Sequence, residues 1–237
     1  MSKFYSEIAK YYDYIFPTGK AQMDLIKEIA GEAPKDVLDA ACGNGGYSFG
    51  LSESGYNITA IDLDEEMVKS IRAKNKNIDA EVLNMLDIEI LNKKFDLIFC
   101  IGNSLVHLKD NEEIYKFLKS CKRSLKPNGK LLLQIVNYDR VLDKDIKSLP
   151  TIENENVKLV FERHYQYLKD EHKVDFKTVL KVAGEELENH VLLYPIKSSE
   201  LKELLEKSGF SNVNLYGGFK KDEFKALESF ALVIVVE

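Results

Sequence analysis

The sequence VLDAACGNGGYSFGL, residues 37–51, runs from apolar residues through an acid to small residues and then to helical spacing. Three of its glycines, Gly43, Gly45 and Gly46, lie close together where a strand is expected to give way to a helix. Glycine weakens the interior of a regular element, so such a cluster requires a reason. We expect that another group comes very close to the backbone at this turn.

Strand-like and helix-like segments alternate on both sides of this turn. Apolar strands are expected at residues 36–41, 57–62, 79–84, 95–101 and 129–136, and helical patterns separate them. Two further strands are expected near the end of the chain, at residues 211–216 and in SFALVIVVE. Parallel strands joined by right-handed helical crossovers form a doubly wound sheet. The sequence therefore predicts an α/β fold with a mostly parallel, seven-stranded, Rossmann-like sheet.

After the fifth predicted strand the hydrophobic pattern changes its period. Residues 157–167 and 173–182 alternate between apolar and polar positions, and residues 187–194 suit a third strand. This pattern predicts an antiparallel β insert within residues 150–195. Because sheet-and-helix pattern flanks the insert, we expect residues 1–237 to form a single domain that closes with a helix and strands in residues 198–237.

Composition and charge exclude several classes of protein. The formal charge is −6, which is poorly suited to binding the phosphate backbone of a nucleic acid. No apolar run approaches the ~20 residues that span a bilayer, and MSKFYSEIAK lacks a secretory signal. Cys42, Cys100 and Cys121 include no C-x-x-C pair, and the histidines lack metal-ligand spacing, so we expect a cytoplasmic protein with no metal site.

The turn at residues 43–46 is expected to bind a ligand, because ligands of open α/β sheets lie beyond the carboxyl ends of the strands. A dinucleotide fingerprint would have a third glycine where Ser48 stands, and a P-loop would have a lysine that is absent. Asp39 precedes the turn, and Asp62 ends the second predicted strand, where a carboxylate can accept both hydroxyls of a ribose. This arrangement indicates a nucleoside site without a pyrophosphate.

Four segments together resemble the class I S-adenosylmethionine-dependent methyltransferases: VLDAACGNG, AIDLDEEMV, VLNMLDI and FDLIFCIGNSLVHL. The resemblance implies S-adenosylmethionine as the cofactor, bound by residues 35–136. It places Asp62 at the ribose, and Asn84 at the adenine where the family commonly has an acid. The other residues implied at the cofactor are Asp39, Ala41, Gly43, Gly45, Leu63, Met85, Cys100 and Ile101.

The segments CIGNSLVHL and NYDRVL resemble the glycine and sarcosine N-methyltransferases. This resemblance implies a substrate site at Asn103, His107, Asn137 and Tyr138. Those enzymes hold the substrate carboxylate with an arginine where Val136 stands here, so Arg163 or Arg140 would have to replace it. The layout of the chain also resembles N,N-dimethyltransferases of nucleotide-linked amino sugars. Both families methylate amines of small molecules, which indicates a small-molecule amine as the acceptor.

Two features have both a catalytic and a structural interpretation. His107 is suited to accept a proton from an amine, or it packs under the rim of the sheet. Tyrosines 5, 11, 12 and 14 precede the core, and residues 1–31 are expected to form a helical lid. The resemblance implies that Tyr12, as a catalytic residue, or Tyr11 approaches the cofactor, whereas the alternative is packing against the sheet edge.

Three alternatives remain open at the level of the sequence. The chain could methylate RNA or protein, although its acidic charge argues against RNA. It could also bind S-adenosylmethionine without catalysis. The insert at 150–195 lines the substrate side of the site, pairs with another subunit to form a homodimer, or does both.

Overall fold

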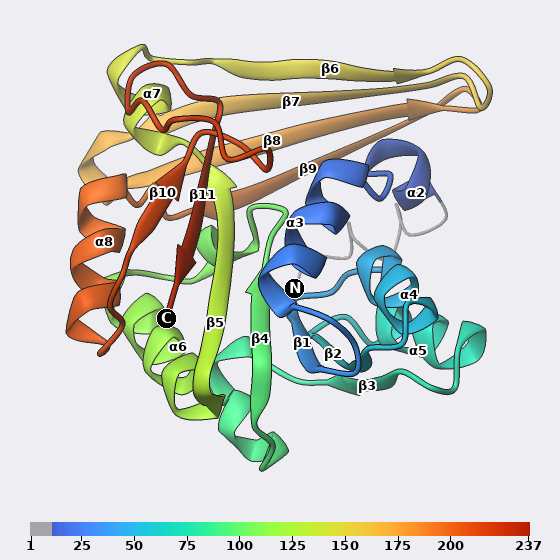
Figure 1. Ribbon diagram of the computed structural model, residues 1–237. Coiled ribbons are helices and arrows are strands. Elements are labelled where there is room, and N and C mark those ends of the chain that lie inside the picture. The colour runs from blue at the N-terminus through green and yellow to red at the C-terminus, as the bar shows by residue number, and fades with distance from the viewer. Residues whose placement is uncertain (1–10) are drawn as a thin grey trace.

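The computed structural model describes residues 11–237, so the expectation for Tyr5 lies outside the described residues. Its main sheet has seven strands in the order β10-β11-β5-β4-β1-β2-β3 (Figure 1). Only β11 runs antiparallel to its neighbours in this sheet. The strands are β1 (Asp36–Ala40), β2 (Asn57–Asp62), β3 (Asp79–Val82), β4 (Phe95–Cys100), β5 (Leu125–Val136), β10 (Asn214–Tyr216) and β11 (Ala231–Val236). The predicted doubly wound fold is confirmed.

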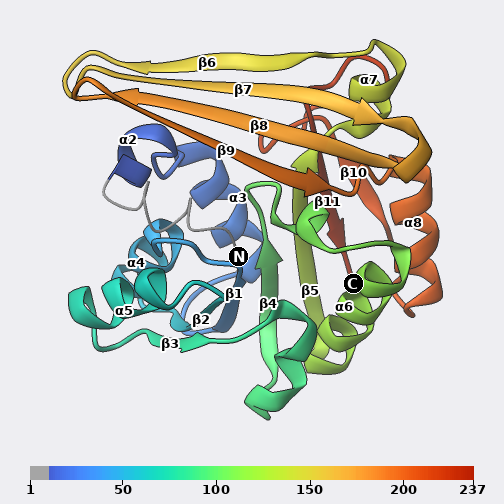
Figure 2. The same ribbon diagram turned by 180° about the vertical axis from the view of Figure 1, so that it is seen from behind.

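Helices cover both faces of this sheet and form a core on each side (Figures 1 and 2). One face carries α3 (Lys20–Ala30), α4 (Gly46–Glu53) and α5 (Glu65–Lys74), and the other carries α6 (Asn111–Ser124) and α8 (Ser198–Lys207). Successive side chains of a strand point to opposite faces. Consequently β1 contributes Leu38 to one core and Val37 to the other.

Side-chain caps explain where two of these helices begin. Asp64 accepts hydrogen bonds from the backbone N–H groups of Glu66 and Met67 at the start of α5. Asp110 does the same for the first turn of α6. Such caps satisfy backbone donors that a helix end leaves unpaired. The capped start of α5 follows directly after β2 and fixes the loop that carries Asp62 and Leu63.

A second sheet, which we call the cap sheet, lies across the carboxyl ends of the main sheet (Figures 1 and 2). Its antiparallel strands are β6 (Ser148–Asn154), β7 (Leu159–Leu168), β8 (Lys173–Val182) and β9 (Glu185–Leu193). The short helix α7 (Tyr138–Asp143) leads into it, and the 3-10 turn η4 (Lys169–Glu171) joins β7 to β8. The predicted antiparallel insert is thus present, with β6 as an additional strand. Pro150 and the polar residues of this edge strand obscure its pattern in the sequence.

The cap sheet shares a core with the main sheet. Tyr165, Val174 and Leu193 of the cap sheet belong to the same buried cluster as Ile135 of β5. The N–H of Tyr194 donates a hydrogen bond of 2.8 Å to the carbonyl of Val106, in the 3-10 turn η3 (Ser104–His107). These contacts fix the distance between the cap sheet and the loops at the ends of the strands.

The described part of the predicted N-terminal helix is α2 (Tyr12–Ile15). Ile15 is buried in a cluster with Phe161 and Leu180 of the cap sheet. The aromatic ring of Phe16 meets that of Phe161 edge to face, with centroids 5.7 Å apart. In contrast, α3 packs on the main sheet through Leu25 and Ile26. Of the two helices described in residues 11–31, α2 therefore lies under the cap sheet and α3 lies on the main sheet. Among residues 11–237, no helix is long and apolar enough to cross a membrane.

Candidate active site

Two adjoining cavities lie at the carboxyl ends of the parallel strands, between them and the cap sheet. The first has a volume of about 470 Å³ and extends over β2, and the second has a volume of about 390 Å³ and extends toward β5 and the cap sheet. The residues that line both cavities are Tyr12, Ala41, Gly102, Ser104 and His107. The cavities therefore meet at the loops that follow β1 and β4.

Asp62 stands at the end of β2 with both carboxylate oxygens anchored. One oxygen accepts a hydrogen bond of 2.8 Å from the N–H of Gly43, and the other accepts one of 2.9 Å from the N–H of Asp64. Burial raises the pKa of this carboxyl. Each oxygen can accept a further hydrogen bond, so together they suit two neighbouring hydroxyl groups. Leu63 and Met85 line the same cavity and supply apolar walls.

Asp39 is the acid at the second cavity. Its side chain is 4% exposed and accepts a hydrogen bond of 2.7 Å from the hydroxyl of Ser48. Burial raises the pKa of Asp39 to about 7, and the nearby charge of Asp62 acts in the same direction. Among the described residues no lysine or arginine forms an ion pair with it. A buried carboxylate of this kind is suited to a ligand that carries positive charge.

Two glycines of the turn at residues 43–46 are required for different reasons. Gly43 has a φ of +54° and lines the first cavity, and a Cβ there would stand 3.1 Å from the hydroxyl oxygen of Tyr12. Gly45 has a φ of +81°, and a Cβ there would stand 2.7 Å from Ile71 of α5. Gly45 lines neither cavity, so the expected close approach at that position comes from the protein's own packing. The structure therefore does not bring Gly45 together with the other residues that were predicted at the cofactor.

The loop after β4 is held by Asn103, which has a φ of +70°. Its side-chain oxygen accepts a hydrogen bond of 2.9 Å from the N–H of Val136, and its amide nitrogen donates one of 3.2 Å to the hydroxyl of Tyr138. Asn103 thus bridges the ends of β4 and β5 while lining the second cavity. Ile101 also lines that cavity, whereas Cys100 is fully buried in the core and lines neither cavity.

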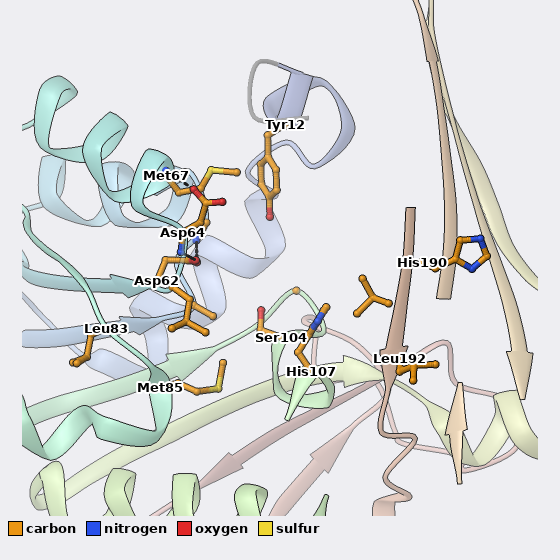
Figure 3. Close-up of a pocket in the computed structure, with 15 residues that line it drawn as sticks. Tyr12, Asp62, Asp64, Met67, Leu83, Met85, Ser104, His107, His190 and Leu192 are labelled. Atoms are coloured by element: carbon orange, nitrogen blue, oxygen red, sulfur yellow. Dashed lines mark hydrogen bonds between the residues drawn. The ribbon is translucent and has the colours of Figure 1, made fainter. Parts of the chain in front are cut away.

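His107 lies where the two cavities meet. In Figure 3 its ring and the hydroxyl end of Tyr12 approach the same space from opposite sides. The imidazole is exposed to this space, and partial burial among the surrounding atoms lowers its pKa. The ring is therefore neutral at neutral pH and able to accept a proton.

Two residues expected at the substrate do not line the cavities. Asn137 is 1% exposed, and its amide nitrogen donates hydrogen bonds of 2.8 Å to the carbonyls of Ala226 and Ser229. Its side-chain oxygen accepts from the N–H of Arg140 at the start of α7. Tyr138 is equally buried and meets Asn103. Both side chains are engaged within the protein, and their contact with a substrate stays a prediction.

Asn84 and Tyr11 are two further residues predicted at the cofactor whose side chains are engaged within the protein. The side-chain oxygen of Asn84 accepts a hydrogen bond of 3.0 Å from the N–H of Leu86, and so caps the 3-10 helix η2 (Met85–Leu91). Asn84 lines neither cavity, although Met85 beside it does. Tyr11 packs against the cluster around Ile15 rather than lining a cavity. Tyr12 occupies the position between the cavities.

Several lining residues were not predicted from the sequence. The second cavity includes Thr18, Gln22, Gln134, Tyr165 and Phe176. Gln134 accepts a hydrogen bond of 2.8 Å from the N–H of Gly102 and so supports the loop after β4. A polar residue inside the apolar run LLLQIV was a usable signal for it. Tyr165 lies two residues after Arg163 in β7, so both side chains are on the same face of the cap sheet. Arg163, which was predicted to bind the substrate, also lines this cavity.

Within the part of the chain that is described, no group of three or more histidine, cysteine, aspartate or glutamate side chains could hold a metal ion.

Comparisons with known proteins place this site in a family. Residues 37–129 match the family model described as a methyltransferase domain. The chain is 30% identical over 209 residues to a glycine/sarcosine N-methyltransferase from Aphanothece halophytica, covering 83% of this chain and 74% of the relative. The fold is similar to that of the CcbJ methyltransferase from Streptomyces caelestis, with a TM-score of 0.82 at 19% identity over 97% of this chain and 95% of that one.

The sugar N-methyltransferase KedS8 from Streptoalloteichus also shares the fold, with a TM-score of 0.72 at 16% identity over 95% of this chain and 91% of that one. The sequence motifs, the order of the strands in the main sheet and the similarity to the relative from Aphanothece halophytica all indicate the same family. The chain belongs to the class I S-adenosylmethionine-dependent methyltransferases and is an enzyme of that family.

Proposed function

We propose that this enzyme transfers the methyl group of S-adenosylmethionine to an amine nitrogen of a small molecule. The observation that carries the proposal is the position of His107 at the junction of the two cavities, where partial burial lowers its pKa. The names of the relatives support it, since they include glycine/sarcosine and sugar N-methyltransferases. The cap sheet supports a small acceptor, because it covers the second cavity.

The carboxylates and apolar walls of the site fit S-adenosylmethionine. In this proposal Asp62 accepts hydrogen bonds from the ribose hydroxyls, and Leu63 and Met85 enclose the adenine. Asp39 compensates the positive charge of the methionine end. Ala41, Gly43 and Ile101 line the space between these groups. The cofactor, when bound, supplies a methyl group on a positively charged sulfur, which is open to attack by a nucleophile.

The protein's own residues prepare the nucleophile. An ammonium ion has no lone pair, so an amine acceptor must lose a proton before or during transfer. His107 is neutral and takes up that proton, and Tyr12 bounds the junction from the opposite side. Holding the nitrogen in line with the methyl group accounts for much of the expected acceleration. The segment around α2, which is the part of the proposed lid in residues 11–31 that packs under the cap sheet, helps to exclude water from this junction.

The division of labour along the chain is part of the proposal. Residues 35–136 bind the cofactor, and the insert within 150–195 covers the acceptor. Residues 198–237 add β10 and β11 to the main sheet and α8 to one of its faces. All parts act as a single domain of 1–237.

A panel of small amines, tRNA and a protein mixture, each incubated with the enzyme and isotopically labelled S-adenosylmethionine, tests the proposal. We expect label to enter at least one amine and neither macromolecule. Labelling of the tRNA or the protein mixture alone would overturn the proposal. Binding of the cofactor without labelling of any acceptor would instead indicate a protein that binds the cofactor without catalysis.

His107→Gln supplies the second test. The acid limb of the wild-type pH profile of kcat/KM for the acceptor, measured at saturating S-adenosylmethionine, should lie below the ordinary histidine pKa of ~6.5, because desolvation lowers the pKa of His107. The variant should lose this limb and roughly 100-fold or more of its activity. A variant that keeps both would contradict the role of a base.

A further inference from the structure

The part of the second cavity that extends toward β5 and the cap sheet, which we call the acceptor end, has mainly apolar walls. The cap sheet contributes Tyr165 and Phe176, which are directly paired across β7 and β8 with ring centroids 5.3 Å apart. Leu149 of β6 and Val136 of β5 line the same cavity. Four strands thus bring aromatic or aliphatic side chains to the acceptor end.

The hydroxyl group of Tyr165 does not make this wall polar. Tyr165 is 4% exposed, and its hydroxyl oxygen is buried. Its ring packs beside that of Tyr138, which is itself buried, with centroids 6.3 Å apart. Tyr165 therefore contributes its ring, and not its hydroxyl group, to the surface of the cavity.

The segment around α2 adds a further aromatic ring to the second cavity. Phe16 follows α2, lines this cavity and is 37% exposed. Its ring lies 5.2 Å from that of Tyr12 and 5.7 Å from that of Phe161 in the cap sheet, between centroids. An exposed apolar ring at a cavity is stabilised when an apolar ligand covers it.

The polar side chains near these walls are largely engaged within the protein. Asn103 uses both ends of its amide, and the side-chain oxygen of Gln134 accepts from the N–H of Gly102. Arg163 is the one arginine or lysine among the described residues that line this cavity. Its guanidinium donates a hydrogen bond of 2.7 Å to the carbonyl of Pro150, and its Nε is buried. A ligand rich in hydroxyl groups would leave many of them unpaired here, which is costly.

We propose that the acceptor is an amine carried by an apolar ring, and that Phe16, Leu149 and Phe176 select it by covering that ring. This inference rests on the proposed function and names its substrate class. The amine nitrogen faces His107 at the junction of the two cavities, and the ring occupies the acceptor end beside Val136. Sites for ring-bearing small molecules have this composition, with mostly apolar walls and few polar groups.

Three primary amines test the proposal: benzylamine, which has an apolar ring, glucosamine, which has a polar ring, and glycine, which has no ring. Their binding is measured by calorimetry on the enzyme saturated with S-adenosylhomocysteine. We expect benzylamine to bind roughly 10-fold or more tightly than the other two, with a negative change in heat capacity. Preference for glucosamine would overturn the apolar character of the acceptor, and preference for glycine would overturn the ring. Binding of none of the three would also overturn the proposal.

Methylation of the same amines with labelled S-adenosylmethionine separates this inference from the proposed function. Binding is read without turnover. Benzylamine that binds most tightly but is not methylated would therefore count against the proposed methyl transfer and still support the apolar acceptor end. Methylation of glycine or glucosamine in preference to benzylamine would support the methyl transfer and overturn the apolar acceptor.

Phe16→Ala is the first variant, with Tyr14→Ala as the matched control. Both residues are partly exposed aromatics of the same segment, but Tyr14, 46% exposed, lines neither cavity. We expect F16A to raise the dissociation constant of benzylamine roughly 10-fold and Y14A to leave it unchanged. The affinity for S-adenosylhomocysteine should be the same in both variants. Equal dissociation constants of benzylamine in F16A and Y14A would overturn the role of Phe16.

Phe176→Leu tests the wall that the cap sheet provides. It keeps an apolar side chain but removes the flat ring, so we expect the dissociation constant of benzylamine to rise roughly 3- to 10-fold. Lys177→Gln is the control, because Lys177 is the next residue of β8 and pairs with Glu188 on the outer face. Melting temperatures confirm that both variants are folded. An unchanged dissociation constant in folded F176L would overturn the placement of the ring against the cap sheet.

Discussion

For single side chains, Asp62 offers the most direct test of where the cofactor lies. Both of its oxygens are held by backbone N–H groups, so the carboxylate is fixed before any ligand arrives. Asp62→Ala removes two charge-assisted acceptors for the ribose, and we expect the dissociation constant of S-adenosylmethionine to rise roughly 30- to 300-fold by calorimetry. Asp79→Ala, an exposed carboxylate at the start of β3, is the control. Unchanged affinity in Asp62→Ala would place the ribose elsewhere.

Asp39 makes cofactor binding depend on pH. Its pKa is about 7 in the ligand-free enzyme, so the carboxyl is largely protonated below neutrality. A positively charged ligand favours the ionised form, so binding should release a proton, and affinity should rise with pH up to about 7 and then level off. Calorimetry between about pH 5.5 and 8.5 measures both effects. Asp39→Asn should bind more weakly and show a flat profile, and a wild-type profile that is already flat would contradict this role.

Among the elements, the turn from β1 into α4 depends on Gly45. An alanine there would need a φ of +81° and would bring its Cβ to 2.7 Å from Ile71. We expect Gly45→Ala to lower the free energy of unfolding by about 2–4 kcal/mol, from backbone strain and overpacking together. Gly184→Ala is a matched control, since Gly184 has a φ of +82° and nothing within 4 Å of its Cβ position. Denaturant titrations giving equal losses would show that packing on α5 is not the constraint.

The elements also show what the sequence could predict. Alternating strands and helices, and the period-two insert, are local patterns, so the main sheet and most of the cap sheet followed from them. The edge strand β6 was missed because Pro150 and polar positions hide its period. Asn137 and Asn84 were predicted at ligands, and the structure shows hydrogen bonds between each side chain and backbone groups, which the sequence analysis did not foresee. The hydrogen bonds of Asn137 depend on which loops meet in the fold, because residues 226–229 are far from Asn137 in the sequence.

Across the entire chain, the two sheets are one structural unit. A single buried cluster contains Ile98 of β4, Leu118 of α6 and Leu201 of α8 together with Tyr165 and Leu193 of the cap sheet. The cavities lie between these parts, and they take lining residues from both sheets and from the segment around α2. A site built in this way loses its shape if either sheet opens, so folding and ligand binding should be coupled.

This coupling predicts one cooperative unfolding transition that the cofactor shifts as a whole. Loss of either sheet would expose the shared core, so circular dichroism and the fluorescence of a tryptophan placed at exposed His164 of the cap sheet should report the same midpoint.

S-adenosylmethionine at about 100 times its dissociation constant should add about 2.7 kcal/mol to the free energy of unfolding. That corresponds to a rise of roughly 5–10 °C in melting temperature, seen equally by both probes. Asp62→Ala should unfold in a single transition too, but with a smaller shift at the same cofactor concentration. Two separate transitions, or a cofactor shift confined to one probe, would mean that the cap sheet folds independently of the cofactor site.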